Sequence, residues 1–403
     1  MAADGVTTQQ WQRIDNLVAK EQSALLALFR DLHQNPELSH EEKETSARYA
    51  KELRAAGFTV TERFGGYGVV GVLKNGKGPT PLLRADMDAL PIQEATGLAY
   101  ASKNRGVMHA CGHDVHMTNA IGTARVLSAM KDAWRGTVII IGQPAEERGA
   151  GSKQMLKAGL RTKFPKYDQA VGLHIHDSLE AGKLSFLEGF ILASVDSVDI
   201  TIRGQGGHGA APHLGIDPIV MSAEFITALQ TIVSRNVEPI KDAVVTVGSI
   251  HGGTKHNIIP DEVKLQLTLR TFEPDVRATL LKRITALIHG IAQAHGAPKP
   301  SMRTSEGVPS TFNDPALGRR LMPVLKAAGK GFETGSKGMY GEDFSRYALG
   351  QKVPTTFFSL GVMPKAKAKR GYAHSAKFQA DVKAALPSGI RAMVGVVLTL
   401  QGR

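Results

Sequence analysis

The chain has 403 residues, of which 42% are hydrophobic and 21% charged, and it carries a formal net charge of +12. This composition is typical of a globular protein, and a chain of this length usually divides into two domains. A single cysteine, Cys111, excludes an internal disulfide. No stretch of 18 apolar residues is present, so we expect no membrane span and no membrane partner.

The positive charge favours a solvated basic surface over a nucleic-acid site. The basic residues are scattered and aromatic residues make up only 6% of the chain, whereas nucleic-acid modules cluster basic residues and add stacking aromatics. The one dense basic run (Lys365, Lys367, Lys369 and Arg370) is interpreted as an exposed loop. The N-terminus lacks the pattern of a secretion signal. We therefore expect a cytoplasmic protein, or a periplasmic one if a signal has been removed.

The first 190 residues alternate between helical and buried-strand patterns. Apolar residues recur at helical spacing in 9–34, and a second helix is predicted over 40–56, before Gly57. Near-continuous apolar runs are typical of parallel strands covered on both faces, and they occur at Val69–Leu73, Pro81–Ala85, Thr137–Gly142 and Gln169–His174. Helical stretches, 116–130 and 153–158, lie between some of them. This alternation predicts an α/β sheet with helices on its faces.

The pattern changes near residue 191, where strands with alternating apolar and polar residues begin. Such alternation is typical of antiparallel strands that are exposed on one face. The expected order of strand, helix, strand, strand, helix, strand is the split βαβ arrangement, over 194–203, 218–234, 243–251, 262–271, 275–295 and 299–304. After Gly307 the earlier pattern returns. We therefore predict a large domain in two parts, 1–190 and 306–403, with a smaller domain, 191–305, inserted.

Polar residues end four segments of the large domain where a strand should stop: 83–88, 109–114, 143–147 and 172–176. The carboxyl ends of strands in an open α/β sheet gather at one edge, where ligands bind. Thiolate, imidazole and carboxylate groups would converge there, and a divalent metal such as zinc prefers these ligands. Each residue alone has an ordinary structural interpretation, such as a buried cysteine or a core histidine. The coincidence of four such segments favours a metal site.

Local spacing refines this prediction. Residues two apart in an extended chain point the same way, so Cys111 and His113 can bind as a pair, and Asp86 and Asp88 can face one site. The neighbours Glu146 and Glu147 face apart in an extended chain. One of the two could then bind metal while the other acts as a base.

Further motifs accompany these segments in the same order as in a known family, and they are Leu32–Ser39, Cys111–Asp114, Gly206–His213, Asn257–Asp261, Gly341–Phe344 and His374–Ser375. With them the chain resembles the group of hippurate hydrolases, N-acyl-amino-acid amidohydrolases and auxin-conjugate hydrolases over almost its whole length. This group is the Cys-Gly-His-Asp branch of the aminoacylase and carboxypeptidase metallopeptidases. The resemblance implies an α/β fold with a mixed zinc-peptidase-like sheet and an inserted lid or dimerisation domain of the ferredoxin-like βαββαβ type.

The resemblance also implies the residues of a site with two divalent metal ions, zinc or manganese. It makes Cys111 a bridging thiolate, and the remaining ligands would be His113, Glu147, His174 and His374. Glu146 would be the general base that activates water. Asp88 would be a carboxylate behind the ligands. Other branches have a histidine in place of Asp86 and an aspartate in place of Cys111.

Substrate contacts are implied in the inserted domain. His208 would stabilise the oxyanion and, as in relatives, reach the site of a partner subunit in a homodimer or higher oligomer. Arg270 would bind the substrate carboxylate as a fork, with Asn257 beside it. Without the resemblance, a structural histidine in a Gly-rich turn and a surface arginine would be the first interpretations. Three stretches depart from the family pattern, His116–Met117, Arg148–Gly151 and His256. We expect none of them to touch a ligand, but the last two could reshape the substrate pocket.

We therefore expect metal-dependent hydrolysis of the amide bond of small N-acyl or N-aroyl amino acids. A dipeptidase or carboxypeptidase of the same family is the alternative substrate assignment. A non-catalytic protein that binds an anion is a third hypothesis, and it predicts that ligand residues are lost. All the ligand residues and Glu146 are present, which argues against it.

Overall fold

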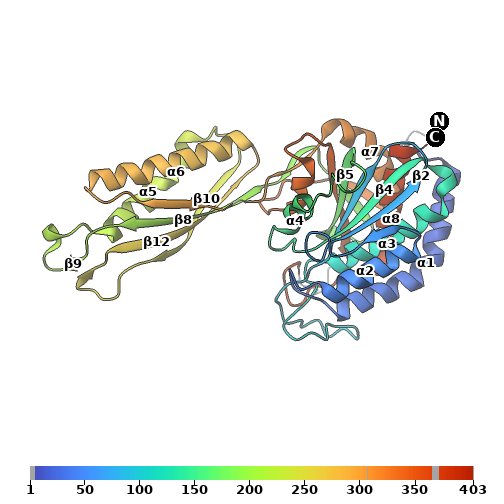
Figure 1. Cartoon of the computed structure of the whole chain (residues 1–403), viewed down its shortest axis with the longest axis horizontal. Helices are drawn as coiled ribbons and strands as arrows, with labels where there is room; N and C mark the ends of the chain where they lie inside the picture. The colour runs from blue at the N-terminus through green and yellow to red at the C-terminus, as the bar shows by residue number, and fades with distance from the viewer. Residues whose placement is uncertain (1–4, 306, 365–371, 403) are drawn as a thin grey trace. The chain divides into compact units, whose positions relative to one another are not determined.

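The computed structural model of the chain describes residues 5–305, 307–364 and 372–402 (Figure 1). The predicted basic loop at 365–370 lies outside the described residues. The chain divides into two units: unit 1 comprises Met1–Gly189, Phe312–Lys337 and Asp343–Arg403, and unit 2 comprises Phe190–Thr311 and Gly338–Glu342. The predicted inserted range, 191–305, lies within unit 2, which also takes in the residues up to Thr311 and a short later segment.

Unit 1 is built on a mixed sheet of eight strands in the order β1-β2-β4-β3-β5-β16-β6-β15. Its strands are β1 (Thr59–Thr61), β2 (Val69–Asn75), β3 (Pro81–Asp86), β4 (Gly136–Gln143), β5 (Gln169–Glu180), β6 (Lys183–Phe186), β15 (Gly331–Thr334) and β16 (Thr355–Met363). Strands β3, β4, β5 and β16 run parallel to one another, so their carboxyl ends meet at one edge. The mixed α/β fold class is confirmed.

The expectation that β2 is a parallel strand was wrong, because β2 runs antiparallel to β4. Its apolar run reflects burial under helices, and burial on both faces does not fix the direction of a strand. Since β2 starts opposite the end of β4, the loop before β2 lies at the same edge of the sheet as the carboxyl ends of the parallel strands.

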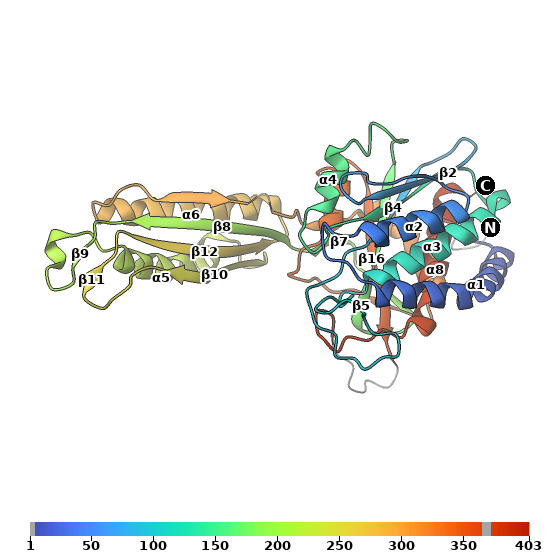
Figure 2. The same ribbon diagram turned by 60° about the horizontal axis from the view of Figure 1, so that its bottom comes forward.

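The helices of unit 1 are α1 (Thr8–Gln34), α2 (Lys43–Ala55), α3 (His113–Ala129), α4 (Gly151–Lys157), α7 (Pro315–Ala328) and α8 (Val382–Gln401), with a 3-10 helix at Asp343–Ala348. Helix α1 starts at a capping box in which the Thr7 and Gln10 side chains each bond the other residue's backbone N–H. Helices α1, α3 and α8 pack against one another beside the sheet (Figures 1 and 2).

Helix α8 is the one helix within the described residues that is long and apolar enough to cross a membrane by length and composition alone. However, 72% of its most apolar window is buried, and it packs against α1, α3 and α7. Its apolar surface is thus part of the hydrophobic core of unit 1.

Unit 2 has an antiparallel sheet in the order β10-β12-β8-β13 with two helices on one face (Figures 1 and 2). Its elements are β8 (Ser194–Arg203), α5 (Pro218–Asn236), β10 (Ala243–His251), β12 (Glu262–Thr271), α6 (Pro274–Ala294) and β13 (Ser301–Thr304). Alternate residues of β8 and β12 pack with the helices in one core, as the period of two predicts. A small pair, β9 (Gly207–His208) and β11 (Ile258–Ile259), extends from it, and β7 (Gly189–Leu192) and β14 (Thr311–Asn313) lie where the chain passes between the units.

Candidate metal centre

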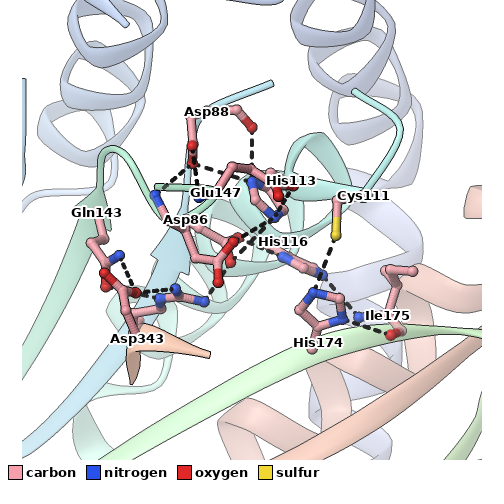
Figure 3. Close-up of polar contacts among 12 residues, drawn as sticks. Asp86, Asp88, Cys111, His113, His116, Gln143, Glu147, His174, Ile175 and Asp343 are labelled. Carbon is pink, nitrogen blue, oxygen red and sulfur yellow. Dashed lines mark hydrogen bonds and ion pairs between the residues drawn. The ribbon is translucent and has the colours of Figure 1, made fainter. Parts of the chain in front are cut away.

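Four of the five side chains expected to bind metal, Cys111, His113, Glu147 and His174, come together at the carboxyl edge of the unit 1 sheet (Figure 3). The ligand atoms of Cys111, His113 and Glu147 all lie within 4.8 Å of one another. The Cys111 Sγ lies 3.6 Å from the His174 Nε2. The His374 Nε2 lies 3.7 Å from the Glu147 Oε1. Five residues from four separate segments of the chain thus meet in one cluster, which we call the ligand cluster.

Two histidines of the ligand cluster are held in the tautomer that a metal ligand needs. The Nδ1 of His113 lies 2.8 Å from the carbonyl oxygen of Asp88, and the Nδ1 of His174 lies 2.7 Å from that of Ile175. A carbonyl oxygen can only accept, so each Nδ1 carries the proton and donates it. Each Nε2 then presents a lone pair to the cluster, as in metal sites where a second group orients the imidazole.

Two ligand atoms are buried without a partner. The His113 Nε2 and the Glu147 Oε1 are inaccessible to water and form no hydrogen bond among the described residues, although only 3.8 Å separates them. Buried polar atoms are rarely left unpaired, because desolvation without a new bond is costly. A cation between these atoms would satisfy both of them.

The electrostatic field of the ligand cluster also fits a cation. Burial by itself would lower the pKa of His113, but the carboxylates of Asp86 and Asp88 raise it well above its usual value. Burial raises the pKa of the Cys111 thiol and of the Glu147 carboxyl. The same carboxylates that favour a proton on the imidazole would attract a metal ion in its place. The ion would in turn stabilise the thiolate form of Cys111 and the carboxylate form of Glu147. The residues present therefore fit a divalent metal ion.

Asp88 holds the turn that carries both glutamates. Its carboxylate accepts hydrogen bonds from the Ser39 hydroxyl at 2.6 Å, the Glu146 N–H at 3.1 Å and the Glu147 N–H at 3.0 Å. Burial would raise the pKa of Asp88, but these bonds and His113 lower it overall. Asp88 is therefore an ionised anchor behind the ligand cluster.

The expectation that Glu146 and Glu147 face apart on an extended chain was wrong. Ala145, before them, has φ of +49°, and a backbone bond of 2.6 Å from the Gly149 N–H to the Glu146 oxygen closes a turn. The side chains of both glutamates approach the same imidazole, with Glu146 Oε2 at 3.9 Å and Glu147 Oε1 at 3.8 Å from the His113 Nε2. The turn, and not strand periodicity, orients the pair.

His116 belongs to a second group of possible ligands with Asp86, His113 and His174. Its Nε2 accepts from the Ile175 N–H at 2.8 Å, so its Nδ1 is protonated and donates to Asp86 at 2.6 Å. Both ring nitrogens are occupied, which leaves no lone pair for a metal. His116 also packs against His174, with the ring centroids 4.6 Å apart. The expectation that His116 touches no ligand was therefore wrong, and it acts as a support.

A buried charged network lies beneath the cluster. The Arg84 guanidinium bonds Asp86, the Gln143 amide oxygen at 3.1 Å and Asp343 at 3.2 Å. Burial would raise the pKa of Asp86, but Arg84 together with His113 and His116 lowers it well below its usual value. The sequence offered a signal for Arg84, because it lies two residues before Asp86 and so shares its side of the strand. Gln143 and Asp343 lie in stretches that the sequence singled out, 143–147 and Gly341–Phe344, but no local spacing predicts their contact with Arg84.

A second charged network lies beside the N-terminus of α3. The His33 ring bonds Asp114 at 2.7 Å and Glu94 at 3.4 Å, with its side chain only 6% exposed. Burial would lower the pKa of His33, but these carboxylates raise it to about 10. The cation thus joins the last turn of α1 to Asp114, the residue that follows His113.

His208 and Asn257 are neighbours within unit 2. In the β9–β11 pair His208 lies opposite Ile258, and the Gly209 N–H donates to the Asn257 oxygen at 2.9 Å. Arg270 is half-buried near the far end of β12, opposite Val195. The expectation that Asn257 lies beside Arg270 was wrong, because β12 separates them. The eight residue steps from Glu262 to Arg270 alone span roughly 26 Å of strand.

Comparisons with known proteins agree with this geometry. The family model "Peptidase family M20/M25/M40" matches residues 82–399. Thermostable carboxypeptidase 1 of Saccharolobus solfataricus is 37% identical over 374 residues, which cover 92% of this chain and 94% of the relative. The N-acyl-L-amino acid amidohydrolase of Geobacillus stearothermophilus is 39% identical over 288 residues, 71% of this chain and 77% of the relative. A solved dinuclear metal-binding peptidase of the M20 family from Bacillus subtilis has a TM-score of 0.81 at 31% identity, covering 95% of this chain and 99% of that one.

Proposed function

Because the chain belongs to the peptidase family M20/M25/M40 and is a metal-dependent hydrolase of amide bonds, we propose that it hydrolyses N-acyl or N-aroyl amino acids, as hippurate hydrolases do. The observation that carries the proposal is the ligand cluster, in which the buried His113 Nε2 and Glu147 Oε1 face each other without a hydrogen bond from any described residue. The amidohydrolase relative, named for N-acyl-L-amino acids, supports this substrate class.

In this proposal Cys111, His113, Glu147, His174 and His374 hold two divalent ions, zinc or manganese. When bound, such ions polarise the substrate carbonyl and acidify water. The mixed thiolate, imidazole and carboxylate donors suit zinc, and manganese remains an alternative for the same site. Metal analysis of the purified protein tests both the number and the identity of the ions.

Glu146 is proposed as the general base. Its carboxylate lies beside the ligand cluster, 3.9 Å from the His113 Nε2, and Asp88 fixes its backbone N–H. From this position it can take a proton from the attacking water and pass it to the leaving amine. Glu147, one residue along, is left to bind metal through its Oε1, which has no hydrogen-bond partner among the described residues.

The substrate-binding residues of unit 2 support a homodimer. His208 and Asn257 lie together, whereas Arg270 lies roughly 26 Å of strand away. One small substrate cannot contact both ends of β12 in one copy of unit 2. We propose that Arg270 serves the substrate carboxylate in one site, while His208 and Asn257 serve the site of a partner subunit. Light scattering of the purified protein, together with activity from mixtures of Arg270→Ala and His208→Ala chains, tests this arrangement.

A carboxypeptidase or dipeptidase is the second candidate, since one relative is named a thermostable carboxypeptidase. Hydrolysis of benzoyl-, acetyl- and indoleacetyl-amino acids should be measured beside dipeptides and N-blocked dipeptides. Faster turnover of the N-acyl amino acids would support the proposal, whereas faster turnover of peptides would replace it. Failure of the metal-loaded protein to cleave any of them would favour a protein that only binds anions. A cytoplasmic location stays a prediction, which cell fractionation would test.

A further inference from the structure

A cavity of about 560 Å³ lies in unit 1 behind the turn that carries Glu146. Its volume falls within the range of about 300–1,000 Å³ that is usual for small-molecule sites. Pro144, Tyr67 and Lys157 line it, together with Glu42 and the pair Gly65 and Gly66. None of the proposed metal ligands lines it. The cavity is therefore separate from the ligand cluster, although it shares the loop after β4.

Gly65 and Gly66 form the wall of the cavity beside α4. Both residues have positive φ, +66° and +99°, which side chains rarely tolerate. A Cβ on Gly65 would meet the backbone of Met155 at 2.7 Å, and one on Gly66 would meet the Gln154 side chain at 3.3 Å. The backbone thus approaches α4 closely here, and a side chain at Gly65 would collide with it.

Glu42 places a buried carboxylate at this cavity. The residue is 0% exposed, and its Oε1 accepts from the Ala145 N–H at 2.7 Å. Its Oε2 is buried and has no hydrogen-bond partner among the described residues. Burial raises the pKa of Glu42 to about 7, and a positive charge beside the free oxygen would favour the ionised form. The cavity therefore lacks a donor at this oxygen.

Lys157 gives the same cavity an opposite charge. It is the exposed last residue of α4, and it forms no ion pair within the described part of the chain. Glu42 and Lys157 thus line one cavity but form no ion pair with each other. A metal cation would satisfy Glu42 but not Lys157, and a simple anion would be repelled by Glu42. A molecule with an ammonium group and a carboxylate matches both, and Tyr67 and Pro144 offer apolar surface to its side chain.

We propose that this cavity binds a free α-amino acid, with its ammonium group on Glu42 and its carboxylate on Lys157. The bound ammonium group would share Glu42 with the Ala145 N–H, which sets the positive-φ turn before Glu146. The ligand thus contacts the residue that positions the proposed base. The proposal that the cavity binds an amino acid does not depend on the proposed function. Hydrolysis of an N-acyl amino acid would also release such an amino acid, and this second link rests on the proposed function.

The test is calorimetric titration of the metal-loaded full-length protein with L-leucine, 3-methylbutylamine and 4-methylpentanoate. The last two carry only the ammonium or only the carboxylate group. We expect L-leucine to bind, and each single-charge analogue to bind about tenfold more weakly or worse. Glu42→Gln and Lys157→Met should each weaken L-leucine binding by about tenfold or more. Lys153→Met, also exposed on α4 but absent from the cavity wall, should not.

Lys157→Met keeps the proposal testable if Glu42→Gln does not fold, because Lys157 is exposed and a melting curve can verify the fold of the variant. No binding of L-leucine, or equal binding by the wild type and Lys157→Met, would overturn the proposal. If the wild type and Lys157→Met bound L-leucine equally and N-acetyl-L-leucine displaced it from both, the amino acid would belong to the catalytic site instead. Binding that depends on Lys157 in a protein that cleaves no N-acyl amino acid would sink the proposed function alone.

Discussion

Replacing Asp88 by asparagine tests whether this carboxylate holds the glutamate turn. Its Oδ1 accepts from the Glu146 N–H, and its Oδ2 accepts from both the Glu147 N–H and the Ser39 hydroxyl. In Asp88→Asn one oxygen becomes an NH₂ group, which cannot accept. The asparagine amide keeps two of the three bonds if its oxygen takes the Oδ2 position, because this oxygen then still accepts from the Ser39 hydroxyl and the Glu147 N–H. The Glu146 N–H is left facing a donor.

The magnitude follows from that lost bond. A hydrogen bond to a charged group contributes about 1.5–3 kcal/mol, so the free energy of unfolding should fall by at least this amount. A displacement of about 1 Å in a reacting group can cost roughly 10²-fold in rate. We therefore expect kcat of the Asp88→Asn variant to fall about 10²-fold at saturating metal. Loss of a group behind metal ligands also weakens metal binding by about 10–100-fold.

The assay is steady-state hydrolysis of an N-acyl amino acid, with bound metal measured by mass spectrometry in the same samples. Ser39→Ala is the matched control, because it removes one bond to Asp88 but leaves both glutamate N–H bonds. It should retain most of the kcat. If the metal-loaded Asp88→Asn variant kept the kcat of the wild type, Asp88 would not hold the turn in the active protein.

Three further predictions concern separate groups. Glu146→Gln should retain its metal and lose about 10²–10⁴-fold in kcat. Metal analysis beside kinetics checks this, and a metal-loaded variant that kept the wild-type kcat, or a variant that lost its metal, would contradict the assignment. Arg84→Met leaves buried Asp86 and Asp343 without the guanidinium that bonds them. Urea denaturation should therefore show a free energy of unfolding lower by about 3–5 kcal/mol. His33 has its pKa raised to about 10 in the fold, so its contribution is complete below about pH 6.5 and is lost as pH rises through about 10. Denaturation at pH 7 and pH 10 should show a smaller loss of stability in His33→Gln than in the wild type.

The sequence by itself determined the elements and the edge at which the site lies. The alternating strands of unit 2, 194–203, 243–251 and 262–271, coincide with β8, β10 and β12, because a period of two is a local signal. The metal-ligand types at the strand ends also predicted their meeting place, since parallel strands bring their carboxyl ends to one edge. The two-metal reaction and the N-acyl substrate came from the resemblance, which rests on motifs spread along the whole chain.

Only the tertiary structure decided how these groups are held. The positive-φ turn at Ala145 rests on Glu42, which is 103 residues away in the chain, and no local pattern encodes such a contact. His116 has the chemistry of a ligand, yet its bonds to Asp86 and the Ile175 N–H occupy both ring nitrogens. Asn257 and Arg270 lie far apart because β12 is extended between them. Each of these outcomes depends on hydrogen-bond partners from distant segments, and a sequence pattern reports only the residues beside it.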